Sequence, residues 1–124
     1  MILHEFDPSK EAVINVEDVI DAVPGMPEIG VSCYSRITLE RIASELNAVR
    51  IASTSTANGE TDVYKAVYKG KEIALFMMDV GAPMSVTMLE DVFAMGVQKV
   101  IVFGSCGVLD RKIDDCSVII PIGP

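Results

Sequence analysis

The sequence is poor in residues that bind metals or form cross-links. It has no tryptophan, one histidine (His4) and three cysteines in 124 residues. The cysteines, Cys33, Cys106 and Cys116, form no CxxC pair, and a single histidine supplies too few ligands for a zinc site. Reduced cysteines are typical of cytosolic proteins. We therefore expect a cytoplasmic protein with no bound metal.

Basic residues and long hydrophobic runs are also scarce. Ten lysines and arginines stand against 18 aspartates and glutamates, which gives a net charge of −8 and disfavours nucleic acid as a partner. No apolar run reaches the roughly 20 residues that cross a bilayer, and residues 1–7 lack the pattern of a secretory signal, so we expect no membrane association. Half of the residues are hydrophobic, which is enough for one domain with a buried core.

The most informative stretch is Lys99–Leu109, in which an apolar run ends abruptly in small residues. Residues 100–103 are β-branched or aromatic and predict a strand buried on both faces. The turn Gly104-Ser-Cys-Gly107 lets a ligand approach the backbone, and ligands of open α/β sheets bind beyond the carboxyl ends of strands. Ser105 offers a hydroxyl, and the turn offers N–H groups, to an anion or a sugar. The alternative is that the small residues serve only to make a sharp turn.

Alternating strand and helix patterns predict an α/β protein. Residues 1–27 are expected to form an extended arm with a short helix from Asn15 to about Ala22. Turns at Asn58-Gly59 and at residues 68–71 predict a three-stranded antiparallel meander, which favours a mixed sheet. The predicted elements are strands at 29–33, 49–57, 61–68, 72–78, 98–103 and 116–121, and helices at 36–46, capped by Ser35, and at 85–95, ended by Gly96.

A second glycine turn, Val80-Gly-Ala-Pro83, follows the strand predicted at 72–78. The helix at 85–95 connects this strand to the one at 98–103, so the three form a βαβ unit whose strands end at the same edge of the sheet. The turns at 80–83 and 104–107 are therefore predicted to lie side by side and to form a ligand cleft.

Several of these motifs, in this order and spacing, resemble the purine nucleoside/uridine phosphorylase superfamily. The shared features are Gly81-Ala-Pro83 at the start of a helix, Gly96 at its end, the run from Val100 to Leu109, and Asp115-Cys-Ser-Val-Ile-Ile-Pro121. The resemblance implies an α/β fold with a mixed central sheet flanked by helices, phosphorylase/hydrolase-like. It also implies that residues 28–124 are the N-terminal half of such a domain, following the arm and short helix of residues 1–27, so that the chain is expected to be truncated.

The resemblance also implies roles for individual residues. In that family the turn after this strand binds phosphate through its hydroxyl and lines the base and ribose pocket, and an arginine early in the chain also binds phosphate. Around that arginine the segment Ser32-Cys-Tyr-Ser35 differs from the family's Gly-Asp-Pro. Carried over to this sequence, the resemblance implies phosphate binding by Ser105, Gly104 and Arg36, and nucleoside binding by Val80, Gly81, Cys106 and Gly107.

The implied activity is cleavage of the N-glycosidic bond of a purine or pyrimidine nucleoside in nucleotide salvage, with phosphate as co-substrate and no further cofactor. Family groups that act on ribose and base lie beyond residue 124, so the chain is expected to work as a homo-oligomer or together with a C-terminal half. Val102 stands where phosphorylases carry a phosphate-binding arginine, which favours a hydrolytic nucleosidase as an alternative. A second alternative is a non-catalytic ligand-binding or assembly fragment.

Overall fold

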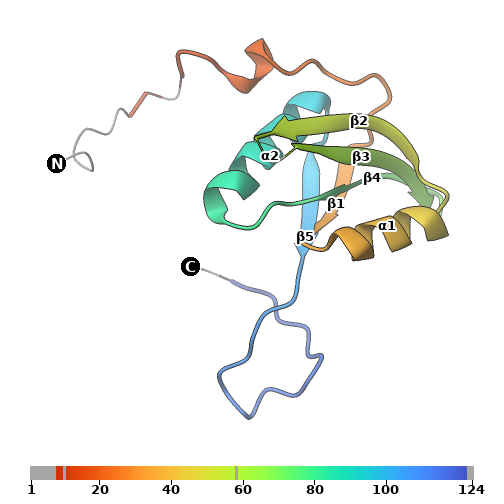
Figure 1. The fold of residues 1–124 in the computed structure, drawn as a ribbon, viewed down its shortest axis with the longest axis vertical. Coiled ribbons are helices and arrows are strands. Elements are labelled where there is room, and N and C mark those ends of the chain that lie inside the picture. Colours follow the sequence, from red (N-terminus) through yellow and green to blue (C-terminus); the bar gives the residue numbers. More distant parts are fainter. Residues whose placement is uncertain (1–7, 10, 58, 123–124) are drawn as a thin grey trace.

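A five-stranded mixed sheet forms the centre of the computed structural model, which describes residues 8, 9, 11–57 and 59–122. The strand order is β2-β3-β4-β1-β5 (Figure 1). β1 runs parallel to β4 and β5, whereas β2, β3 and β4 form the antiparallel meander that the turns predict. The predicted mixed sheet is therefore confirmed. Its strands are β1 (Ile29–Cys33), β2 (Val49–Thr56), β3 (Gly59–Tyr68), β4 (Lys71–Met77) and β5 (Lys99–Phe103).

β1 lies between β4 and β5, so the two strands of the predicted βαβ unit are not neighbours. Cys33 at the end of β1 pairs with Met77 of β4 on one side and with Phe103 of β5 on the other. The prediction that the two glycine turns lie side by side is therefore wrong, because the end of β1 separates them. Three parallel strands, rather than two, thus end at this edge of the sheet.

The helices α1 (Arg36–Glu45) and α2 (Ala82–Met95) pack on opposite faces of the sheet. Helix α1 starts as predicted, because the Ser35 hydroxyl accepts a hydrogen bond from the Thr38 N–H at 3.3 Å. Helix α2 begins three residues earlier than predicted, with Pro83 as its second residue, and ends at Gly96, whose φ is +123°. The larger core lies under α2 and includes Phe76, Met78, Met88 and Val92.

The first described residues form only a single 3₁₀ turn, Val16–Asp18, where a helix to about Ala22 was predicted. The capping part of the prediction is confirmed, since the Asn15 N–H donates to the Asp18 carboxylate at 2.8 Å. Beyond this turn, the Val23 N–H donates to the carbonyl of Met95 at 2.9 Å. This bond attaches the arm to the end of α2.

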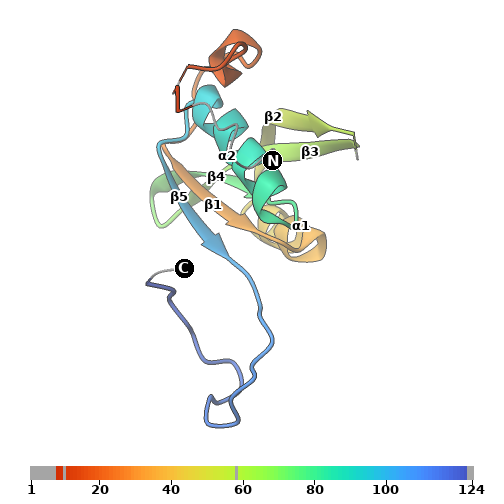
Figure 2. The same ribbon diagram turned by 90° about the vertical axis from the view of Figure 1, so that its left-hand side faces the viewer.

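β5 is an edge strand, and the prediction that it is buried on both faces is wrong. Helix α1 packs on β1 and β4, so Ile101 is left 62% exposed and Phe103 43% exposed. Residues 104–122 then run away from the sheet as an exposed segment (Figures 1 and 2). The strand predicted at 116–121 is not formed, because no described strand lies beside it to complete its hydrogen bonds. Among the described residues, no helix has both the length and the apolar character needed to cross a membrane.

Candidate functional site

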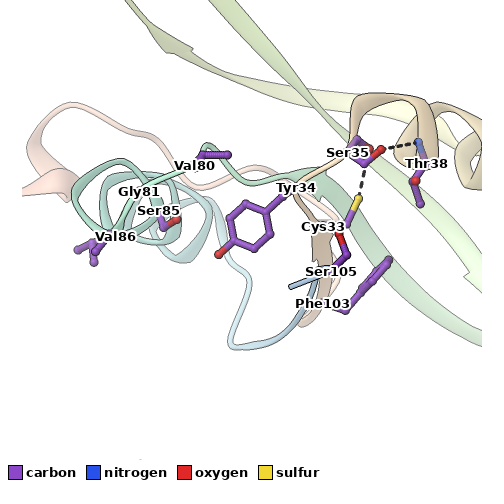
Figure 3. Close-up of a pocket in the computed structure, with 12 residues that line it drawn as sticks. Cys33, Tyr34, Ser35, Thr38, Val80, Gly81, Ser85, Val86, Phe103 and Ser105 are labelled. Atoms are coloured by element: carbon purple, nitrogen blue, oxygen red, sulfur yellow. Dashed lines mark hydrogen bonds between the residues drawn. The ribbon is translucent and has the colours of Figure 1, made fainter. Parts of the chain in front are cut away.

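A cavity of about 900 Å³ lies at the carboxyl ends of the three parallel strands (Figure 3). Segments from the end of β1, the β4–α2 turn and the end of β5 contribute its walls. This is the place where open α/β sheets bind ligands. The lining residues are Cys33, Tyr34, Ser35, Thr38, Val80, Gly81, Ala82, Ser85, Val86, Phe103, Gly104 and Ser105.

Four residues proposed from the sequence line this cavity together. Val80 and Gly81 come from the turn after β4, and Gly104 and Ser105 follow β5. Arg36, Cys106 and Gly107 are exposed and lie outside the lining. The structure thus brings the two glycine turns to one cavity, and the binding roles of all seven residues stay predictions.

The turn between β4 and α2 is fixed by local hydrogen bonds. Gly81 has a φ of +106°, a conformation that side-chain-bearing residues rarely adopt. The Ser85 N–H donates to the carbonyl of Gly81 at 2.9 Å, and the Ser85 hydroxyl donates to the carbonyl of Asp79 at 2.9 Å. These bonds hold the start of α2 against the cavity.

The start of α1 is held on the other side of the cavity. Cys33 is buried, and its thiol donates to the carbonyl of Ser35 at 3.4 Å. Ser35 and Thr38 belong to the first turn of α1, just as Gly81 and Ser85 belong to the first turn of α2. Both helices therefore begin at the cavity, and the partial positive charge of each helix N-terminus favours an anion or an electron-rich oxygen there.

No residue that lines the cavity, among those that the structure describes, carries a lysine, arginine, histidine or carboxylate side chain. Arg36 lies outside this lining. The pKa of the Asp62 carboxyl on β3 is lowered, chiefly because Arg50 donates a hydrogen bond to it, and the charge of Arg36 adds a smaller attraction. The polar groups that the cavity offers are accordingly backbone N–H groups and the hydroxyls of Tyr34, Ser35, Thr38, Ser85 and Ser105.

The contribution of β1 to the cavity was not predicted from the sequence. Tyr34, Ser35 and Thr38 line the cavity because β1 lies between β4 and β5, an arrangement that pairs residues far apart in the sequence. The sequence did contain a signal for this contribution. A segment of small polar residues follows the strand at 29–33, just as turns with small residues follow the strands at 72–78 and 98–103. The described residues include no group of three or more His, Cys, Asp or Glu side chains that could hold a metal ion.

The fold and the cavity define an α/β protein with a mixed sheet and a cavity at its parallel strand ends. The sequence profile of the Phosphorylase superfamily matches residues 28–123, and the chain belongs to that family. Its structure is similar to that of uridine phosphorylase from Vibrio fischeri ES114, with a TM-score of 0.63 and 24% sequence identity. The similarity covers 87% of this chain and 43% of that one, so this chain spans less than half of the length of that enzyme. No curated protein matches the chain.

Proposed function

We propose that the protein is a nucleoside phosphorylase, which cleaves the N-glycosidic bond of a purine or pyrimidine nucleoside with phosphate. The observation that carries this proposal is the cavity at three parallel strand ends, where two helices begin, in a member of the Phosphorylase superfamily. The similarity in fold to a uridine phosphorylase supports the same class of substrate. Phosphate is the co-substrate, and the proposal requires no other cofactor.

In this proposal the lining residues hold the nucleophile and one side of the nucleoside. The Ser105 hydroxyl and the N–H groups of the turn that starts at Gly104 bind phosphate, with Arg36 as an added charge. Cleavage also requires a positively charged sugar to be stabilised and the leaving base to be protonated. No carboxylate lines the cavity among the described residues. We therefore propose that the groups that stabilise the sugar and protonate the base come from a further segment or from a second copy of the chain. The nucleoside contacts proposed for this chain are Val80, Gly81, Cys106 and Gly107.

Ser105→Ala is expected to weaken phosphate binding by about 1–2 kcal/mol, because one hydrogen bond to a charged group is lost. Titration calorimetry with inorganic phosphate measures the change. Ser117→Ala is the matched control, since Ser117 lies in the same exposed segment but outside the cavity. Equal phosphate affinity for the Ser105→Ala variant and the unsubstituted protein would remove Ser105 from the site.

One observation favours a hydrolytic nucleosidase as a second candidate. The described lining of the cavity has no cationic side chain, and Val102 of β5 stands where the resemblance places a phosphate-binding arginine. Without that charge, water could take the place of phosphate as the nucleophile.

Base release from uridine and inosine, measured with and without phosphate, distinguishes the two candidates. A phosphorylase is expected to release base only when phosphate is present and to form a sugar phosphate. Equal rates of release in phosphate-free buffer, with free ribose as the product, would replace the phosphorylase assignment by the nucleosidase.

A further inference from the structure

Val80 and Gly81 are the nucleoside contacts proposed on the turn between β4 and α2, and this turn has little packing to hold it. Val80 is 84% exposed, and the three residues after it are exposed as well. β4 ends at Met77, before the turn begins. The shape of this wall of the cavity therefore depends on hydrogen bonds from neighbouring residues.

These hydrogen bonds come from one face of helix α2. The Ser85 hydroxyl donates to the carbonyl of Asp79, and the Ser85 N–H donates to the carbonyl of Gly81, both at 2.9 Å. Figure 3 shows the Ser85 side chain beside Gly81. Three residues further along the same helix face, the sulfur of Met88 accepts a hydrogen bond from the Asp79 N–H, with 3.3 Å between N and Sδ. The N–H and the carbonyl of Asp79 are thus both held by α2, which fixes the residue from which the turn starts.

The sulfur of Met88 has a function that packing alone does not require. Met88 is 1% exposed, belongs to the core under α2 and does not line the cavity. A leucine has a similar volume and fills such a space, but it has no hydrogen-bond acceptor, whereas a thioether has one. Without this acceptor the half-buried Asp79 N–H loses its partner. An unpaired N–H favours conformations in which water reaches it, and these conformations displace the turn.

We propose that Met88 and Ser85 are positioning residues for the nucleoside, which hold the β4–α2 turn so that Val80 and Gly81 form the wall of the cavity. This inference rests on the proposed function and adds how the nucleoside side of the site is kept in shape. The phosphate contacts proposed at the end of β5 belong to a different segment. Nucleoside binding therefore depends on these two residues, and phosphate binding does not.

The test compares the affinities of the protein and its variants for uridine, inosine and inorganic phosphate by calorimetry. Apparent affinity falls with the fraction of molecules in which the turn is in place, and loss of one hydrogen bond shifts that equilibrium roughly threefold to fivefold. We expect Met88→Leu and Ser85→Ala each to weaken the binding of both nucleosides by about this factor and to leave phosphate affinity unchanged. Because Met88 does not line the cavity, its effect cannot come from lost contact with the ligand.

Met95→Leu and Thr87→Ala are the matched controls. Met95 is a second buried methionine of α2 in the same core, and its sulfur accepts no hydrogen bond in the described part of the chain. The Thr87 hydroxyl donates to the carbonyl of Pro83 within α2 at 3.1 Å, and Thr87 does not line the cavity. Neither control variant is expected to change nucleoside affinity.

Amide hydrogen exchange at Asp79, followed by NMR, reports the bond to sulfur without any ligand. In Met88→Leu the Asp79 N–H is expected to exchange roughly fivefold faster than in the unsubstituted protein, and Met95→Leu should leave its exchange unchanged. A merely structural role of Met88 would instead speed exchange throughout α2.

Four outcomes would overturn the inference. Nucleoside affinity that Met88→Leu leaves unchanged overturns it alone and leaves the proposed function standing. An equal loss in Met95→Leu also does so, because core packing rather than the sulfur would then be responsible, and so does an equal loss of phosphate affinity. If thermal unfolding shows that Met88→Leu is not folded, Ser85→Ala and its control Thr87→Ala decide in the same way. Absence of nucleoside binding by the unsubstituted protein overturns the proposed function together with this inference.

Discussion

Gly30→Val is expected to destabilise the protein by about 3 kcal/mol, the upper end of the usual cost of overpacking a core. Gly30 is buried in β1, the strand that has a neighbour on each side. A Cβ at this position would lie 2.9 Å from Cε1 of Phe76, 3.1 Å from Cγ1 of Val97 and 3.3 Å from Cγ2 of Val100. Because Phe76 is itself fully buried, its ring has little room to move. Chemical denaturation monitored by circular dichroism measures the loss.

Gly107→Val is the matched control for this experiment. Gly107 is exposed, its backbone conformation is one that other residues adopt, and a Cβ there would have no heavy atom within 4 Å. We expect this variant to unfold within about 0.5 kcal/mol of the unsubstituted protein, as is usual for exposed substitutions. If Gly30→Val were as stable as Gly107→Val, Phe76 would not pack across β1 as the structure shows.

The protein is expected to self-associate through β5, and Ile101→Lys is expected to weaken this association strongly. β5 is an edge strand with Ile101 62%, Val102 41% and Phe103 43% exposed. Open edges with apolar side chains pair readily with other chains. Loss of one buried isoleucine is worth about 2 kcal/mol, which corresponds to a roughly 30-fold rise in the dissociation constant. Light scattering over a concentration series measures it.

The other edge strand of the sheet, β2, is less suited to pairing with a second chain. β2 carries Arg50, which binds the carboxylates of Glu60 and Asp62, and a run of serines and threonines. Val67→Lys is a suitable control, because Val67 is 56% exposed but lies on β3, where it pairs with Glu72 of β4 and is separated from β5 by β4 and β1. A protein that is monomeric at every concentration, or an equal effect of the two lysines, would contradict association through β5.

Local sequence patterns were sufficient to predict most of the elements but not the order of the strands. Lys69 and Gly70 both have positive φ, which is typical of the tight hairpin that was predicted at 68–71. Ser35 caps α1, and Gly96 ends α2, as their residue types indicate. The position of β1, in contrast, depends on pairing between residues such as Cys33 and Phe103, which no local pattern contains.

The candidate site was also predictable only in the part that depends on local sequence patterns. The rule that ligands bind at strand ends located Gly81 and Ser105 at one cavity. Tyr34 was missed because its contact with Gly104 follows from the strand register. Arg36 was placed by resemblance and by its position in the first turn of a helix, but that position does not specify where its long side chain points. In the structure Arg36 lies outside the cavity lining, and its charge makes only a small contribution to the lowered pKa of Asp62.

The central position of β1 has a consequence for how the chain folds. β1 is synthesised before either of its partners, whereas β2, β3 and β4 can pair as soon as each hairpin leaves the ribosome. Pairing between distant segments closes large loops and slows folding. β1 therefore has no partner until residues 71–77 have been made, and it gains its second partner only when residues 99–103 follow. Because all three strand ends contribute to the cavity, the cavity is completed in the last step of folding. A bound ligand would therefore select chains that have folded to completion.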